Sequence, residues 1–152
     1  MSATPTEHRP LPVSASDVRP MRRAILRPGQ AADELVYPGD EDPASLHLAS
    51  FREGEIVGIA SVMPGGHPRD PRGGDWRIRG MAVAEAHRGR GIGTTLLSAC
   101  EAHARVRGGS RLWCNARIAA RDLYLDGGMV IEGDEFEIPG IGPHLLMSKH
   151  LP

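Results

Sequence analysis

Residues 85–95, EAHRGRGIGTT, bring glycine, arginine and threonine together in one short segment. Three glycines stand at alternate positions, two arginines stand among them and two threonines follow: Gly89, Gly91, Gly93, Arg88, Arg90, Thr94 and Thr95. Before this segment, Trp76–Ala84 alternates well enough to predict a strand. After it, Thr94–Arg107 has apolar residues at helical spacing, which predicts an amphipathic helix. The glycine-rich segment is therefore a loop that joins a strand to a helix.

This arrangement predicts a site for a ligand that carries phosphate. The first N–H groups of a helix have no partner within the helix and can bind an anion, and glycine lets the backbone come close to it. Arg88 and Arg90 add positive charge, and Thr94 and Thr95 can cap the helix or donate hydroxyl hydrogen bonds. The alternative is a flexible turn with a solvated arginine pair.

Two common phosphate sites do not fit the loop. A Walker-type site requires GxxxxGK[ST], and the single lysine of the chain, Lys149, lies far beyond the loop. A dinucleotide site requires GxGxxG, but the sixth position is Thr94 counted from Gly89 and Leu96 counted from Gly91. The spacing of the glycines and of the lysine therefore excludes both the Walker-type site and the dinucleotide site.

The rest of the chain predicts one mixed α/β (α+β) domain over residues 11–152, after a disordered segment at residues 1–10. The predicted strands are Pro12–Ala15, Ser45–Phe51, Ile56–Met63, Trp76–Ala84, Leu112–Asn115, Val130–Ile138 and His144–Met147. The predicted helices run from Ser16 or Asp17 to Leu26, from Thr94 to Arg107 and from Ile118 to Leu125.

Composition and charge limit the possible partners and the class of function. The formal net charge of −1 argues against a nucleic-acid partner, and 17 of the 18 basic residues are arginines. No segment has the apolar length of a signal peptide or a membrane span, so we expect a cytoplasmic protein with no membrane partner. Cys100 and Cys114 lie apart, with no zinc-type spacing, so no metal is expected.

The spacing RxxGxG, at Arg88, Gly91 and Gly93, resembles the loop with which the GCN5-related N-acetyltransferase (GNAT) superfamily cradles the pyrophosphate of acetyl-CoA. A second segment, AARDLYLDGGM at residues 119–129, is similar to the family's AxxxYxxxGF, with Tyr124 at the tyrosine position. The ending GIGPHLLM, at residues 140–147, looks like the last strand of one branch of small bacterial acetyltransferases.

The resemblance implies the acyl-CoA N-acyltransferase fold, a mixed, mostly antiparallel sheet with a V-shaped splay, flanked by helices. The V would open between the strand that ends near Ala84 and the strand Leu112–Asn115. Pantetheine would bond there to the backbone as an added strand. The implied acetyl-CoA contacts are Met81, Ala82, Val83, Arg88, Gly89, Arg90, Gly91, Ile92, Gly93, Thr94 and Asn115. The position of the family's usual asparagine holds Arg117, so either Asn115 or Arg117 is the contact.

The implied activity is transfer of an acetyl group from acetyl-CoA to a small-molecule or peptide amine by direct attack. Tyr124 is the predicted catalytic residue, as a hydrogen-bond donor to the departing sulfur; the alternative is a buried structural tyrosine. Two rival functions remain: a regulatory domain that binds CoA without turnover, and an acyltransferase with another acyl group or an oxygen acceptor. A homodimer is an open alternative for the oligomeric state.

The general base is not identified by the sequence. The candidates, each with a solvated or structural alternative, are Glu135, Glu137, His144, Asp75 and His67. His103 is expected to be a packed or half-exposed helix residue. The acidic run GDED at residues 39–42 is interpreted as a solvated loop, or else as an attraction for a cationic acceptor. Four arginines are interpreted as a solvated helix face, or else as contacts to an anionic acceptor: Arg19, Arg22, Arg23 and Arg27.

Overall fold

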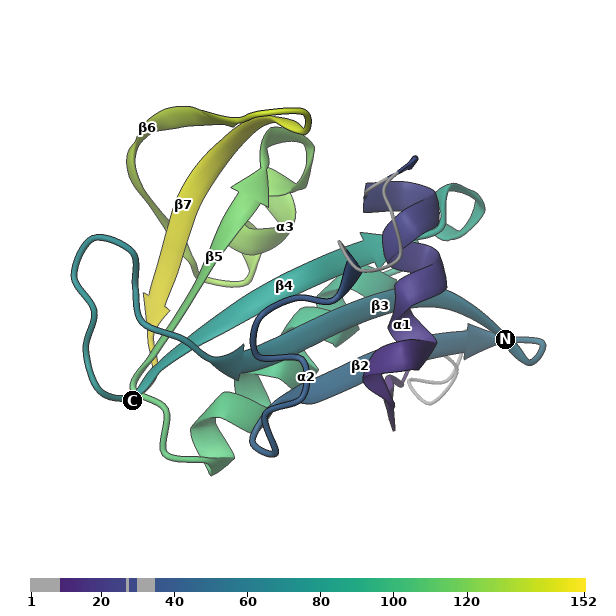
Figure 1. The fold of residues 1–152 in the computed structure, drawn as a ribbon, viewed down its shortest axis with the longest axis horizontal. Coiled ribbons are helices and arrows are strands. Elements are labelled where there is room, and N and C mark those ends of the chain that lie inside the picture. Colours follow the sequence, from purple (N-terminus) through teal and green to yellow (C-terminus); the bar gives the residue numbers. More distant parts are fainter. Residues whose placement is uncertain (1–8, 27, 30–34) are drawn as a thin grey trace.

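The structure, a computed structural model, describes residues 9–26, 28–29 and 35–152. Among these residues seven strands form one sheet in the order β1-β2-β3-β4-β5-β7-β6 (Figure 1). The strands are β1 (Leu11–Val13), β2 (Leu46–Arg52), β3 (Glu55–Pro64), β4 (Asp75–Val83), β5 (Arg111–Arg117), β6 (Val130–Ile138) and β7 (Gly142–His150). The helices are α1 (Ala15–Met21), the π-helix η2 (Arg22–Leu26), the 3-10 helices η4 (Glu85–His87) and η5 (Ile118–Ala120), α2 (Ile92–Val106) and α3 (Arg121–Asp126). Most of the predicted disordered segment, residues 1–8, lies outside the described residues.

The sheet splits at its centre. β4 and β5 pair in parallel only over Asp75–Arg77 and Arg111–Trp113, whereas the other neighbouring strands of the described chain pair antiparallel. Beyond this short ladder the two strands separate, which gives the V seen in Figure 1. The predicted fold, a mostly antiparallel sheet with a V-shaped splay, is confirmed. No helix within the described ranges has the length and apolar character that a membrane crossing requires.

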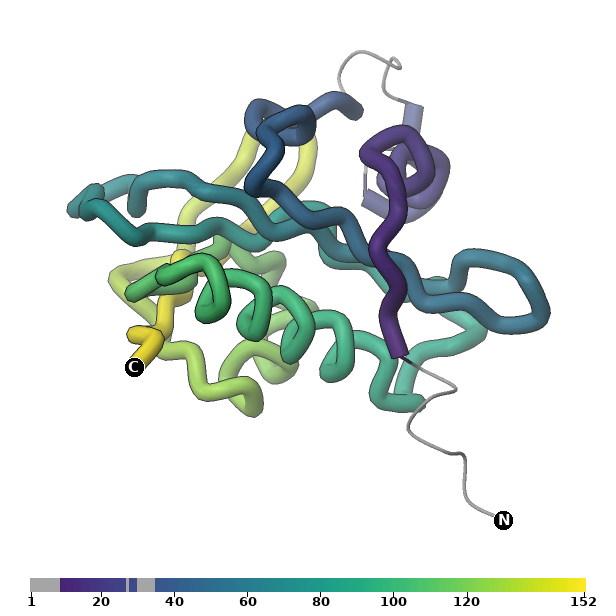
Figure 2. Tube along the Cα trace, turned by 90° about the horizontal axis from the view of Figure 1, so that it is seen from below, coloured from purple at the N-terminus to yellow at the C-terminus, as the bar shows by residue number. Residues whose placement is uncertain are grey.

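Helices cover both faces of the sheet. Figure 2 shows α2 on one face and α1 on the opposite face. The larger core cluster, under α2, includes Leu96, Cys100 and Leu112, and the smaller cluster, under α1, includes Val18 and Ile59. Burial of these apolar side chains stabilises the sheet by roughly 25 cal/mol for each Å² removed from water.

A β-bulge divides β4 into two halves. Gly80 and Met81 both lie opposite Ala60 of β3, so one extra residue is inserted into β4. Gly80 adopts φ 62, a left-handed conformation that suits glycine. Before the bulge Ile78 packs in the core under α2, whereas after it Ala82 packs in the cluster under α1. The bulge therefore reverses the side-chain alternation at the open part of the V.

Helix α1 begins earlier than the sequence predicted. The Ser14 hydroxyl accepts a hydrogen bond from the Asp17 amide at 3.3 Å, and the Asp17 carboxylate accepts one from the Ser14 amide at 3.0 Å. This is a capping box, which places the cap at Ser14 and not at Ser16 or Asp17. The first strand accordingly ends at Val13 and not at Ala15.

Candidate active site

A groove of about 530 Å³ lies in the open part of the V. It is lined by nine of the residues predicted to contact acetyl-CoA: Met81, Ala82, Val83, Arg88, Gly89, Gly91, Ile92, Gly93 and Thr94. Two predicted contacts, Arg90 and Asn115, are not among its lining residues, whereas Arg117 is. The sequence also missed the remaining residues of the lining, which are Ile25, Leu26, His87, Ala119, Ala120 and Leu123.

The loop at one end of the groove leads directly into α2. Gly91 is the N-cap, with φ 82, and the first helical hydrogen bond runs from the Thr95 amide to the Gly91 carbonyl at 3.1 Å. The amides of residues 92–94 precede that bond, and they carry the positive end of a 15-residue helix. Of the two roles predicted for the threonines, capping is not found, because Gly91 is the N-cap and no side chain makes a cap hydrogen bond. The other role is found at Thr95, whose hydroxyl donates to the Ile92 carbonyl at 2.8 Å within the first turn.

Arg88 connects the loop to the end of β4. Its Nε donates to the Val83 carbonyl at 3.0 Å, while the side chain stays at the edge of the groove. A guanidinium has five N–H donors, so this bond leaves most of its donors for other partners. Arg88 therefore both braces the loop and contributes charge to the groove, whereas Arg90 is exposed outside it.

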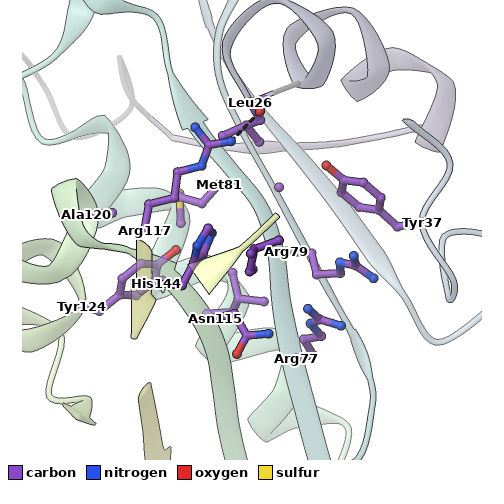
Figure 3. A pocket seen from close by; sticks show the side chains of 14 residues that line it. Leu26, Tyr37, Arg77, Arg79, Met81, Asn115, Arg117, Ala120, Tyr124 and His144 are labelled. Carbon is purple, nitrogen blue, oxygen red and sulfur yellow. Dashed lines mark hydrogen bonds between the residues drawn. The ribbon is translucent and has the colours of Figure 1, made fainter. Parts of the chain in front are cut away.

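A smaller cavity of about 100 Å³ adjoins the groove, and Figure 3 shows the side chains that line this cavity. The two share four lining residues: Leu26, Met81, Arg117 and Ala120. Arg117 stands at this junction, and its Nη2 donates to the Leu26 carbonyl at the end of η2. The bond joins β5 to the helical segment on the other side of the V.

Tyr124 lies in the cavity, on α3, and is only 4% exposed. Burial, followed by the neighbouring Cys114 and Cys100 sulfurs, raises the pKa of the Tyr124 phenol well above its usual value. The hydroxyl therefore stays protonated at any physiological pH and can donate a hydrogen bond.

His144 lies in the same cavity and is 5% exposed. Its Nδ1 is 2.8 Å from the Gly142 carbonyl oxygen. A carbonyl can only accept, so Nδ1 carries the proton and the neutral ring has its lone pair on Nε2. Among the five candidate bases, His144 is the one that lines the cavity, while Glu135 and Glu137 are exposed on β6.

Asp75 and His67 have structural roles. Burial raises the pKa of the Asp75 carboxyl, but hydrogen bonds from Arg111 and from the His67 and Arg72 amides outweigh it and lower the pKa to about 2. The His67 Nε2 lies 2.8 Å from a Glu132 carboxylate oxygen. Both residues therefore hold the loop before β4 in place, at the closed end of the V.

His103 is packed on α2, as expected. Its Nε2 donates to the Ala44 carbonyl at 2.8 Å, and its ring meets the Trp76 ring edge-on with centroids 5.5 Å apart. These contacts hold α2 against the segment at the start of β2, and His103 does not line the groove.

Two predictions of solvated charge are wrong. Arg22 is fully buried, and its guanidinium holds the Asp40 carboxylate with hydrogen bonds of 2.7 and 3.0 Å. Burial raises the pKa of Asp40, but the bonds from Arg22 and from the Tyr37 amide outweigh it and lower the pKa below its usual value. Arg23 is exposed as predicted, whereas Arg27 lies outside the described residues.

The sequence also missed the cationic residues of the cavity wall. Arg77 and Arg79 of β4 and Tyr37 line the cavity together with Asn115. The signal was present in the RIR pattern at residues 77–79, because residues two apart on a strand face the same side of a sheet. Which side that was depended on the packing of α1 and α2.

Comparison with known proteins identifies the family. The model of the acetyltransferase (GNAT) family matches residues 16–127. YitI of Bacillus subtilis (strain 168), described as an uncharacterized N-acetyltransferase, is 36% identical over 139 residues that cover 91% of this chain and 93% of YitI. Mycothiol acetyltransferase of Nocardia farcinica is 34% identical over 102 residues, which cover 61% of this chain and 30% of that protein.

Solved structures share the fold at low sequence identity. Escherichia coli ElaA superposes with a TM-score of 0.73 at 18% identity, covering 93% of this chain and 98% of ElaA. An aminoglycoside 6'-N-acetyltransferase complexed with coenzyme A superposes with a TM-score of 0.70 at 18% identity, covering 91% of each chain. With its splayed sheet, its glycine loop at α2 and these relatives, the chain belongs to the GNAT family of acetyltransferases.

Proposed function

We propose that the protein transfers an acetyl group from acetyl-CoA to an amine, by direct attack of the amine on the thioester. The observation that carries this proposal is that the groove and the smaller cavity adjoin each other. The groove begins at the N-terminus of α2 and shares four lining residues with the cavity that holds Tyr124 and His144. A long substrate with its phosphates at α2 would present its other end to these two side chains.

Backbone groups supply most of the proposed contacts with acetyl-CoA. The amides of Ile92, Gly93 and Thr94, at the positive end of α2, suit the pyrophosphate. The main chain of β4 at Met81 and Val83 suits the pantetheine, which would bond to it as an added strand. A backbone N–H there would also stabilise the negative charge that develops on the thioester oxygen.

His144 is the proposed general base. A lysine-like amine has a pKa near 10.4 and must lose a proton before or during attack. The bond from Nδ1 to the Gly142 carbonyl fixes the tautomer whose Nε2 can accept that proton. The amine nitrogen then bonds to the carbonyl carbon, the carbon–sulfur bond breaks, and the proton resides on Nε2.

Tyr124 is the proposed donor to the departing sulfur. Proton transfer from an ordinary tyrosine to a thiolate is uphill by roughly 2 kcal/mol, and the raised pKa of this buried tyrosine makes it costlier. A hydrogen bond that stabilises the thiolate avoids this cost.

The test is release of free CoA thiol from acetyl-CoA in the presence of an amine panel. We expect turnover, with His144→Gln and Tyr124→Phe each reducing kcat by about 100-fold or more while acetyl-CoA binding is kept. Calorimetric binding of acetyl-CoA without turnover of any amine would instead identify a binding domain. Competition with longer acyl-CoA esters, and alcohols in the panel, would reveal another acyl group or an oxygen acceptor.

A further inference from the structure

Among the described residues that line it, the cavity beyond the proposed thioester position has more cationic than anionic side chains. Its lining includes three arginines, Arg77, Arg79 and Arg117, together with His144. Within the described chain no aspartate or glutamate lines it. The two buried carboxylates of the described residues are engaged elsewhere, Asp40 with Arg22 and Asp75 with Arg111, each by two hydrogen bonds.

Arg77 lies in an unfavourable environment for a cation. Its guanidinium carbon lies 4.7 Å from the centroid of the Trp113 ring, which supplies a cation–π contact. Its Nε is buried and has no hydrogen-bond partner among the described residues. Burial, and then the charge of Arg79, lower the pKa of Arg77 to about 10. The side chain remains charged at neutral pH, so an anion in the cavity would relieve both the desolvation and the repulsion.

Arg79 is held in place by a buried network behind the cavity. Its guanidinium carbon lies 4.3 Å from the centroid of the Tyr37 ring, and that of Arg22 lies 4.0 Å from the same centroid. The Tyr37 amide donates to the Asp40 carboxylate at 3.0 Å, and the same carboxylate binds Arg22. The part of the cavity wall that carries Arg79 is therefore anchored to buried residues of the core.

The third arginine lies across the V. Arg117 of β5 is the register partner of His144 on β7, so the cation and the proposed base are neighbours on adjacent strands. Its bond to the Leu26 carbonyl keeps the side chain at the junction of groove and cavity. An acceptor with its amine at His144 would thus have cationic groups on both sides (Figure 3).

We propose that the acceptor is a small amine that carries an anionic group, a carboxylate or a phosphoryl group, close to the amino group. This inference rests on the proposed function. Guanidinium groups bind both anions by paired, charge-assisted hydrogen bonds. A polycationic acceptor would meet charge repulsion in the same cavity.

The experiment compares kcat/KM for matched acceptors that differ in charge. In the first series each standard L-amino acid is compared with its amide, in which an uncharged carboxamide replaces the carboxylate. In the second series O-phospho-L-serine is compared with L-serine. Kanamycin serves as the polycationic acceptor. We expect at least one acid to exceed its amide by 10-fold or more. The intrinsic reactivity of the amine works in the opposite direction, because an amide's amino group loses its proton more easily.

Variants of Arg77 test the assignment of the anion site. Arg77→Gln should raise KM for the anionic acceptor by about 10- to 100-fold, with a much smaller change for its amide. Arg77→Lys, which keeps a charge, should recover part of the loss. The matched control is Arg107→Gln, an exposed arginine at the far end of α2, which should change neither value.

The outcomes separate this inference from the proposed function. A preference for phosphoserine over serine would identify a phosphoryl group as the anion, and equal use would identify the carboxylate. Turnover of amides or kanamycin at rates equal to or above those of the acids would overturn the anionic acceptor while leaving the acetyltransferase intact. The absence of turnover with both anionic series, in protein that binds acetyl-CoA, would overturn it as well. Failure to bind acetyl-CoA would instead remove the proposed function itself.

Discussion

The Arg111 guanidinium donates two hydrogen bonds to the Asp75 carboxylate, from Nε at 2.8 Å and from Nη2 at 3.0 Å. The same two residues form the first register pair of β4 and β5. The ion pair thus fastens the two strands at the closed end of the V, and the strands diverge from there. The groove therefore lies at the end of these strands opposite to this charged contact.

The contribution of this ion pair to stability should decrease at acidic pH. The folded pKa of Asp75, about 2, lies below the usual value of 3.8, so the carboxylate contributes stability above pH 3.8 that is lost as the pH falls toward 2. The shift corresponds to about 2 kcal/mol at neutral pH. Asp75→Asn should therefore unfold more easily at pH 7 in urea, and its stability should depend less on pH between 4 and 2. Asp134→Asn, at an exposed position on β6, is the control, and an equal loss in both variants would contradict this role.

Substitution of Gly91 should separate ligand binding from stability. Gly91 has φ 82 and open space around its Cα, so Gly91→Val adds about 1–2 kcal/mol of backbone strain without a clash. Gly108, at the other end of α2, has φ 81 and equally open surroundings. Gly91→Val and Gly108→Val should lower the Tm by similar amounts, but only Gly91→Val should raise the Kd for CoA, by about 10-fold or more. Calorimetry that gives the two variants equal affinities would refute the anion site at α2.

Arg88 and Arg90 should differ in their effect on CoA binding. Arg88 lines the groove and braces Val83, whereas Arg90 is exposed outside the groove. Arg88→Ala should raise the Kd for CoA several-fold at low ionic strength, and the difference from wild type should shrink as salt is added. Arg90→Ala should have a smaller effect. A titration in which the two variants behaved alike would rule out a specific role for Arg88.

Removal of one partner of the buried Arg22–Asp40 pair should lower the free energy of unfolding strongly. Asp40→Asn leaves a buried, uncompensated guanidinium and should lower the free energy of unfolding by about 3–5 kcal/mol. The double variant Arg22→Met, Asp40→Asn should lose less than the sum of the two single variants, because no unpaired charge remains. Additive losses in urea denaturation would indicate that the pair is not coupled.

Tyr124 should not limit the rate at alkaline pH. Because burial raises the pKa of its phenol well above 10, the donor stays protonated, and kcat should show no loss from this group up to about pH 10. Tyr124→Phe should reduce kcat across the whole pH range without moving the inflections of the profile. A variant whose profile lost an alkaline inflection would show that the tyrosine titrates during turnover.

Local chemistry in the sequence predicted the loop and what surrounds it. Alternation before residue 85, glycines at 89, 91 and 93, and helical spacing after them predicted strand, loop and helix, and nine of the predicted contacts do line one groove. These signals are short in range, because backbone freedom, capping and amphipathic spacing are properties of neighbouring residues. The helix start was misplaced by two residues because Gly91, not a threonine, is the cap.

The sequence did not predict which charges are buried. The GDED run and the arginines of α1 and η2 have the composition of solvated segments, yet Arg22 and Asp40 meet in the core across 18 residues of chain. Burial of a charge depends on a partner that comes from another element, and composition does not reveal that partner.

By itself the sequence determined the family, the glycine loop and the order of strands and helices, since each depends on patterns within one segment. The tertiary structure alone decided that His144, and not Glu135, Glu137, Asp75 or His67, shares a cavity with Tyr124. It also decided that Arg77 and Arg79 face that cavity. The physical reason is that side chains converge from distant strands: the packing of α1 and α2 sets which face of β4 carries Arg77 and Arg79, and the splay of β4 from β5 opens the space that His144 shares with them.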